Sequence, residues 1–188
     1  MSLVKPMFPN PADLFMLDYP VLVTPKTPGV RCLMVDGNAH GLNMLPIKND
    51  HVRDTLWGLP DYDGVLTINH DILEDNKRFN TKGGEFEFTY YVFDWHATGL
   101  NYVDRMRALA NDENFVPGMT EGWKLVLQYP ITMRDEQSLL LHLNECSFKK
   151  HDGIYIRNPK GLYVYDRSDD FLSLSAVIGK LQQEEEEL

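Results

Sequence analysis

The sequence predicts an α+β fold, in which antiparallel β-sheets are flanked by helices on their outer sides. Segments rich in aromatic and β-branched residues recur along the chain, most densely at residues 86–93. Helical patterns stand between them without the regular strand–helix alternation of a parallel sheet. With 188 residues, 43% of them hydrophobic, the chain can bury the core of one compact domain.

The individual elements follow from local patterns. Strands are expected at residues 21–24, 30–35, 64–69, 86–93, 123–129 and 153–157. Helices are expected at residues 51–57, with Asp50 as the cap, and at residues 101–110 and 137–145. Residues 171–181 remain ambiguous, because their apolar side chains fit both a helical and a strand spacing.

Lys26 is the most informative residue of the chain. It stands at the end of an apolar strand, before a turn and a second strand. In such a setting a lysine can be desolvated and become a nucleophile. The alternative is an inherited structural lysine whose charge lies at the rim of a pocket, since most lysines stay solvated.

The residues around Lys26 resemble the lysine motif of ATP-dependent DNA ligases, usually Lys-x-Asp-Gly followed by x-Arg. Lys26, Gly29 and Arg31 match this motif, whereas Pro28 occupies its acidic position. Pro28 supplies no carboxylate and restricts the backbone of the preceding residue.

Later segments resemble further ligase motifs in the same order. Asp63-Gly64-Val65 stands where those ligases carry Asp-Gly-Glu, and residues 90–94 resemble their Phe-Tyr-Val-Phe-Asp strand. Residues 152–159 resemble Glu-Gly-x-x-x-Arg-x-Pro, and residues 163–168 resemble the Tyr-Lys-x-Gly-Arg-Ser that follows. The likeness extends from residue 19 to residue 168 and is closest to the small viral and phage ligases.

This resemblance implies an adenylation (nucleotidyltransferase) domain with two antiparallel sheets. Residues 1–181 are expected to form it as a single domain without a C-terminal OB domain, followed by an acidic tail at residues 182–188. In the family, the lysine attacks the α-phosphorus of ATP to form lysyl-AMP, and a divalent metal helps. The resemblance assigns the nucleophile's position to Lys26. It assigns nucleotide contacts to Arg31, Phe93, Asp152, Gly153 and Arg167, with Phe93 at the position that stacks on adenine.

Several catalytic positions of the family are changed. Val65 replaces the glutamate of Asp-Gly-Glu, and Leu42 stands where a second arginine is expected. The closing Lys-x-Lys falls near Val177 and Gly179, and a shifted register would supply only Lys180. Because such losses affect one catalytic centre, they act together. Asp152 replaces the strand glutamate with a shorter carboxylate that can still bind a cation.

Each retained residue also has a structural interpretation. Phe93 fits the core of a sheet as well as a stacking platform. Arg31 could simply pair with Asp36 or the acidic surface, and Asp152 could be a turn residue before its strand. The six histidines lack zinc-type pairing, so no metal site is predicted.

Net charge limits the partners. The chain has 18 basic and 28 acidic side chains, a formal charge of −10, which disfavours general binding to duplex DNA. Without Glu184 to Glu187 the charge would still be −6. A local basic cluster is formed by Lys149, Lys150, Arg157, Lys160 and Arg167.

Two functions follow from these observations. The first is a degenerate, non-catalytic ligase-like domain, a pseudoenzyme that binds nucleotide or nucleic acid at the vestigial groove, or a protein through its acidic surface. The second is an active nucleotidyltransferase that forms Lys26-AMP. No cofactor is certain; ATP and Mg are expected only if the ancestral site still functions. Cys32 and Cys146 read as reduced core thiols of a cytoplasmic protein, of phage type by its resemblance, and no segment is long enough to span a membrane.

Overall fold

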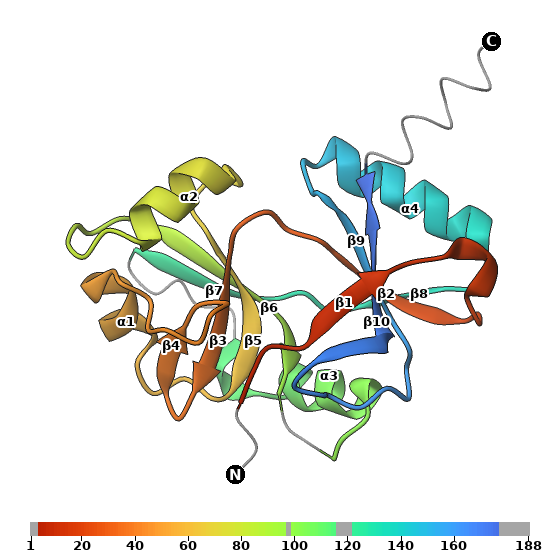
Figure 1. The fold of residues 1–188 in the computed structure, drawn as a ribbon, viewed down its shortest axis with the longest axis horizontal. Coiled ribbons are helices and arrows are strands. Elements are labelled where there is room, and N and C mark those ends of the chain that lie inside the picture. Colours follow the sequence, from red (N-terminus) through yellow and green to blue (C-terminus); the bar gives the residue numbers. More distant parts are fainter. Residues whose placement is uncertain (1–3, 97–98, 116–121, 177–188) are drawn as a thin grey trace.

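Two five-stranded β-sheets face each other in this protein and define its two lobes (Figure 1). The computed structural model describes residues 4–96, 99–115 and 122–176. The first sheet contains, in spatial order, β1 (Phe8–Pro11), β10 (Arg167–Ser175), β9 (Gly153–Arg157), β2 (Val21–Pro25) and β8 (Ile131–Met133). The second contains β4 (Asn38–His40), β3 (Val30–Val35), β5 (Tyr62–Thr67), β6 (Phe88–Trp95) and β7 (Trp123–Leu127).

The predicted two-sheet α+β fold is confirmed, with one correction. Each sheet is mixed rather than purely antiparallel, because β1 pairs with β10 and β6 pairs with β7 in parallel. The short strands β1, β4 and β8 were not expected from the sequence. In β1 the segment Phe-Pro-Asn-Pro lies at the sheet edge, where a proline's missing N–H costs no ladder bond.

Four α-helices lie within the described residues, together with two short 3-10 turns. The helices are α1 (Asp50–Leu56), α2 (Ile72–Phe79), α3 (Tyr102–Ala110) and α4 (Glu136–Phe148), and the turns are η1 (Leu14–Met16) and η2 (Glu113–Phe115). Their side chains join α1, α2 and α3 to the core of the second sheet and α4 to that of the first.

The sequence misplaced the cap of α1 and missed α2. Asn49, not Asp50, caps α1, because its side-chain oxygen accepts the backbone N–H of Val52. Its buried amide also donates to carbonyl oxygens of the loop after α2, which fixes its position. The helix α2 is short and mostly polar, so few apolar residues mark it in the sequence, although Asp71 caps it.

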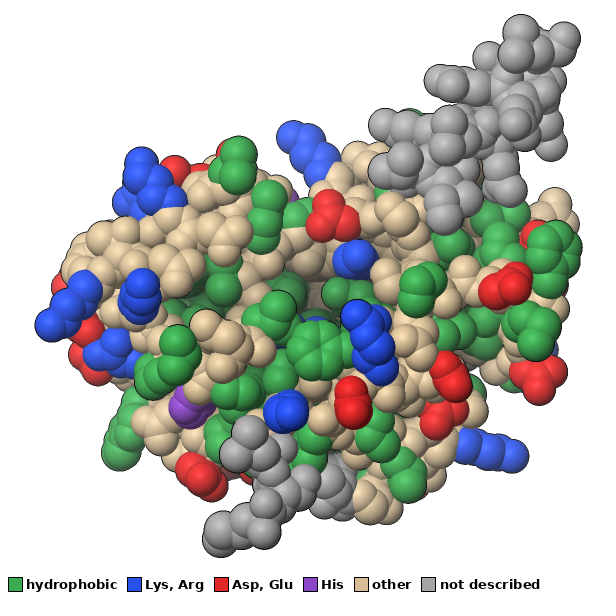
Figure 2. Space-filling view, in the orientation of Figure 1, with side chains coloured by type: hydrophobic (Ala, Val, Ile, Leu, Met, Phe, Trp, Pro, Cys, Tyr) green, Lys and Arg blue, Asp and Glu red, His purple; other side chains and the backbone are tan. Residues whose placement is uncertain are grey.

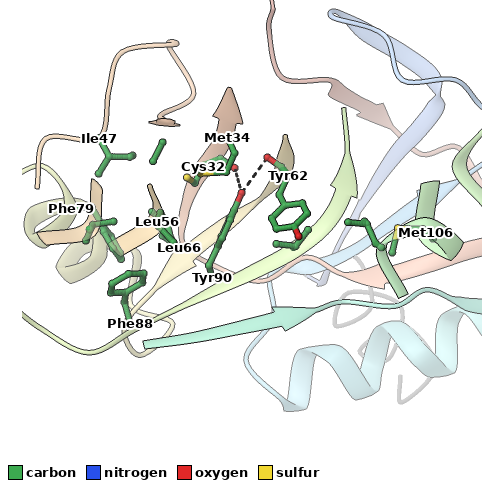
Figure 3. Close-up of a cluster of buried hydrophobic side chains, with 14 of the residues drawn as sticks. Cys32, Met34, Ile47, Leu56, Tyr62, Leu66, Phe79, Phe88, Tyr90 and Met106 are labelled. Atoms are coloured by element: carbon green, nitrogen blue, oxygen red, sulfur yellow. Dashed lines mark hydrogen bonds between the residues drawn. The ribbon is translucent and has the colours of Figure 1, made fainter. Parts of the chain in front are cut away.

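The largest hydrophobic cluster lies between the second sheet and its helices (Figure 3). In its middle, the hydroxyl of the buried Tyr90 donates toward the carbonyl oxygens of Cys32 (3.0 Å) and Tyr62 (3.2 Å). A buried tyrosine therefore satisfies its polar end within the core. Burial also raises the pKa of the Cys32 thiol to about 12.

Buried ion pairs connect the two sheets. Asp94 of β6 is fully buried and accepts two hydrogen bonds from Arg105 of α3, at 2.7 Å and 3.1 Å. Arg157 of β9, in the opposite sheet, pairs with the same carboxylate at 2.9 Å. Its guanidinium group also lies 3.3 Å from the centroid of the Phe171 ring. One carboxylate thus holds together a strand, a helix and the facing sheet.

The glycines of the two Asp-Gly motifs are required by the backbone. A Cβ atom on Gly64 would lie 2.1 Å from the carbonyl oxygen of Tyr91, beside an irregularity in the β5–β6 register. A Cβ atom on Gly153 would lie 2.0 Å from the carbonyl oxygen of Leu174, and its φ of +142° disfavours other residues. Packing alone therefore explains why these glycines are present.

In the ambiguous segment at residues 171–181, residues 171–175 form the end of strand β10. The expected acidic tail at residues 182–188, the domain limit at residue 181, and Val177, Gly179 and Lys180 lie outside the described residues. No helix in the described part of the chain is long and apolar enough to cross a bilayer.

Replacing Asp94 by alanine should lower the free energy of unfolding by about 3–5 kcal/mol, because two arginines would keep buried charges without their partner. The matched control is Asp104→Ala, which removes an exposed ion pair with Arg107 on α3 and should cost less than about 1 kcal/mol. Urea denaturation followed by circular dichroism measures both. Equal midpoints for the two variants would contradict the central role of Asp94.

Candidate functional site

The backbone of Lys26 is joined directly to the strand that carries the second Asp-Gly motif. Its N–H donates to the carbonyl oxygen of Gly153, and its carbonyl accepts the N–H of Asp152, both at 2.9 Å. The pairing of β2 with β9 sets this register. The structure therefore brings Lys26 next to Asp152 and Gly153, which follow it by 126 and 127 positions in the sequence.

The side chain of Lys26 is half-buried and points toward the first sheet. Its Nζ donates to the Ser173 hydroxyl of β10 at 3.3 Å and lies 5.9 Å from the centroid of the Tyr155 ring. Within residues 4–96, 99–115 and 122–176, no carboxylate forms an ion pair with this ammonium group. Lys26 thus keeps an uncompensated positive charge in a partly dry setting.

Arg31, in contrast, is neutralised by the first Asp-Gly motif. Its Nε and Nη2 atoms each donate to Asp63 at 2.6 Å, and Nη2 also donates to the carbonyl oxygen of Met7. Burial by itself would lower the pKa of Arg31, but attraction and hydrogen bonds from Asp63 raise it above its ordinary value. The alternative partner Asp36 was wrong, because β3 and β5 place Asp63 beside Arg31 in the sheet interior.

Asp63 is occupied by side chains of the protein itself. It is fully buried, and besides Arg31 it accepts a hydrogen bond of 2.6 Å from the Tyr163 hydroxyl. The same tyrosine oxygen accepts the backbone N–H of Met7 at 3.0 Å. Burial, followed by the charge of Asp63, raises the pKa of Tyr163 well above its ordinary value. This carboxylate therefore serves a structural network between the sheets.

Phe93 is in the core, with only 1% of its surface exposed. The Arg31 guanidinium group lies 4.7 Å from its ring centroid, and the Tyr155 ring lies 5.5 Å away at an angle of 45°. The ring also shares a buried cluster with Val65 and Met7. A base could stack on Phe93 only after these neighbours had moved. In this structure Phe93 is therefore a core residue, the structural alternative to a stacking platform.

The position of the family's missing glutamate is apolar here. Val65 is buried and lies opposite Arg31 on one side and Tyr91 on the other in the sheet register. Asp152 is exposed. Its backbone N–H donates to the carbonyl oxygen of Lys26, and its carbonyl oxygen accepts the N–H of Ala176. The described residues contain no group of three or more histidine, cysteine or acidic side chains that could hold a metal ion. Since Asp63 is buried and bound by Arg31 and Tyr163, the residues present do not fit a magnesium site.

Arg167 lies apart from the Lys26 site. It is the first residue of β10, whereas Ser173, which contacts Lys26, is near the other end of that strand. The Arg167 side chain is exposed and donates to the carbonyl oxygen of Pro9 at 3.0 Å. The tertiary structure thus does not bring this predicted nucleotide-binding residue to the nucleophile's position.

The turn at Lys26 has polar neighbours that the sequence did not predict. The buried Thr27 hydroxyl contacts the Gln128 amide and, at 3.3 Å, Nδ1 of His151. Burial lowers the pKa of His151, and the nearby charges of His70 and Lys149 lower it further. These residues come from distant segments without a common motif, so only the position of Thr27 next to Lys26 could have pointed to them.

No protein-family model and no curated protein matches the chain, but solved structures do. The DNA ligase-adenylate of Chlorella virus is 23% identical, with a TM-score of 0.84, over 93% of this chain and 68% of that one. A Lig E DNA ligase matches with 16% identity and a TM-score of 0.69, over 92% of this chain and 69% of that one.

The ligase domain of LigD from M. tuberculosis gives a TM-score of 0.67 at 14% identity, over 92% of this chain and 60% of that one. These likenesses extend across both sheets and nearly all of the chain, and they show its architecture. The chain therefore has the fold of the adenylation domain of ATP-dependent DNA ligases.

Proposed function

We propose that this protein is a non-catalytic, ligase-like adenylation domain that binds a phosphate-bearing ligand, a nucleotide or a nucleic-acid end, at Lys26. The observation that carries the proposal is the half-buried charge of Lys26, which has no carboxylate partner among the described residues, whereas Asp63 neutralises Arg31. A cation without a carboxylate partner attracts an anion more strongly in a partly dry site than in water. The related viral structure is named as a ligase-adenylate, which supports a nucleotide as the ligand class.

The same geometry argues against catalysis. Adenylyl transfer would form a bond between Lys26 Nζ and the α-phosphorus while pyrophosphate leaves, and charge develops on the phosphate oxygens. Such reactions depend on preorganised charges and metal ions around those oxygens. Here Val65 brings no carboxylate, Asp63 is fully paired, and Pro28 is a buried imino acid. The residues that would hold a metal and orient the nucleotide are therefore missing or engaged.

Binding makes smaller demands than catalysis. An ammonium group can pair with phosphate without an aligned leaving group, and such charge-assisted bonds are among the stronger ones. The net charge of −10 opposes extended contact with a nucleic-acid backbone. A compact ligand such as a nucleotide, or the end of a single-stranded nucleic acid, is thus favoured over a duplex at Lys26.

The competing function is an active nucleotidyltransferase that forms Lys26-AMP. It is favoured by the position of Lys26, which lies next to the Gly153 strand in a fold shared with adenylated viral ligase. Lys26 and Arg31 also keep the spacing of the lysine motif. The two functions differ in one observable, the covalent adenylate.

Incubation with ATP labelled on the α-phosphate, with magnesium or manganese, should give no labelled protein band on a denaturing gel. The physical reason is the missing stabilisation of phosphate charge, since single catalytic groups of this kind commonly contribute about 10²–10³ in rate. A band that persists in Lys48→Ala and disappears in Lys26→Ala would establish the enzyme and overturn the proposal.

Equilibrium titration with ATP should detect binding that depends on Lys26. Lys26→Ala should weaken it roughly 10-fold to 100-fold, because a hydrogen bond to a charged group contributes about 1.5–3 kcal/mol. Lys48→Ala, which removes an exposed lysine before α1, should leave the affinity almost unchanged. Equal affinities of the two variants, or no binding by the unaltered protein, would exclude a nucleotide site at Lys26.

Phe93→Ala should lower the free energy of unfolding by about 3–5 kcal/mol, as expected for an aromatic residue removed from a packed core. Phe148→Ala removes the same side chain from an exposed site on α4 and should have little effect. Thermal unfolding and urea titration measure the difference. If Phe93→Ala kept full stability and lost only ligand affinity, Phe93 would be a stacking platform instead.

A further inference from the structure

A second surface of the protein exposes large hydrophobic side chains on a well-fixed turn. In η1, Phe15 is 94% exposed and Met16 is 80% exposed. Two contacts fix this turn. Leu14 and Leu17 pack against the hydrophobic cluster that α4 covers, and the Asp13 carboxylate accepts the N–H of Phe15. Phe15 and Met16 thus form an exposed apolar pair next to each other in the chain, on a turn whose backbone is fixed.

Beside this turn lies a surface hollow of about 570 Å³ with mainly apolar walls. The hollow is far from the Lys26 site along β2, because Val21 begins that strand and Lys26 follows its end. Its apolar walls are formed by Met16, Leu17, Pro20, Val21, Ile156 and Leu172. Figure 2 shows hydrophobic side chains grouped at the corresponding end of the molecule, on the right of the view, with acidic side chains among them.

The charges around the hollow are mainly acidic. Asp18 and Asp169 line it, with Lys160 as the basic residue of its wall, and Asp13 stands on the adjoining turn. The whole chain is acidic as well. Such a rim attracts a basic segment and repels both nucleic acid and a second copy of this chain.

We infer that η1 and the adjoining hollow form a docking surface for a partner protein, which presents an apolar anchor flanked by lysine or arginine. The anchor would fill the hollow against Leu17, Ile156 and Leu172, while Phe15 and Met16 pack along its side. The flanking cations would pair with Asp18 and Asp169. This surface lies outside the proposed ligand site and does not depend on it.

Selection from a library of random 12-residue peptides displayed on phage tests this inference. The unaltered protein serves as bait, and a Phe15→Ser/Met16→Ser variant serves for counter-selection. Both residues are exposed, so the variant should keep its fold, which circular dichroism checks. Enriched peptides should combine a large apolar residue with flanking lysine or arginine. Enrichment of acidic peptides, or no enrichment, would overturn the inference.

Fluorescence anisotropy with one enriched, labelled peptide then locates the site. Asp18→Asn/Asp169→Asn should weaken binding roughly 3-fold to 10-fold, as for rim charges worth up to about 1 kcal/mol each, and added salt should weaken it further. Phe15→Ser/Met16→Ser should abolish it, whereas Phe148→Ser, an exposed site on α4, should not. Binding unchanged by the paired serine variant would place the peptide elsewhere. Concentration-dependent dimers lost in that variant would assign the surface to a second copy and also overturn the inference.

Discussion

The structure depends on buried arginine–carboxylate pairs, one of which joins the two sheets. Asp94 holds Arg105 of α3 and Arg157 of the opposite sheet, and Asp63 holds Arg31 and the Tyr163 hydroxyl. Buried charges are tolerated only when their partners satisfy them in good geometry. Each pair therefore fixes the distance and register of the elements that contribute to it, and the aromatic side chains pack around them.

These pairs give the residues of the ligase-like motifs a structural role. The aspartate of Asp-Gly-Val neutralises the arginine of the lysine motif, and the aspartate of the Phe-Asp strand neutralises the arginine after Asp152-Gly153. Gly64 and Gly153 remain because carbonyl oxygens lie where their side chains would be. Packing and charge pairing thus account for these residues, whereas Val65 and Pro28 stand at positions where the resembling ligase motifs carry acidic residues.

The two proposed surfaces follow from where charge is left unpaired. At Lys26 a cation has no carboxylate partner among the described residues, so an anion is favoured there. At η1 the apolar side chains are surrounded by carboxylates, so a cationic partner is favoured. The sites lie beyond opposite ends of β2, and a single acidic domain could use them independently.

The sequence determined the α+β class, the strand that ends at Lys26, and the adenylation-type order of motifs, because these depend on local patterns and spacing. Tertiary structure alone decided which carboxylate pairs with Arg31, since the β3–β5 register brings Asp63 rather than Asp36 to it. It also decided that Phe93 is buried and that Arg167 lies away from Lys26. The physical reason is that burial and charge pairing arise from contacts between strands of one sheet and between the two sheets. Residues far apart in the sequence make those contacts, so a local sequence pattern cannot predict them.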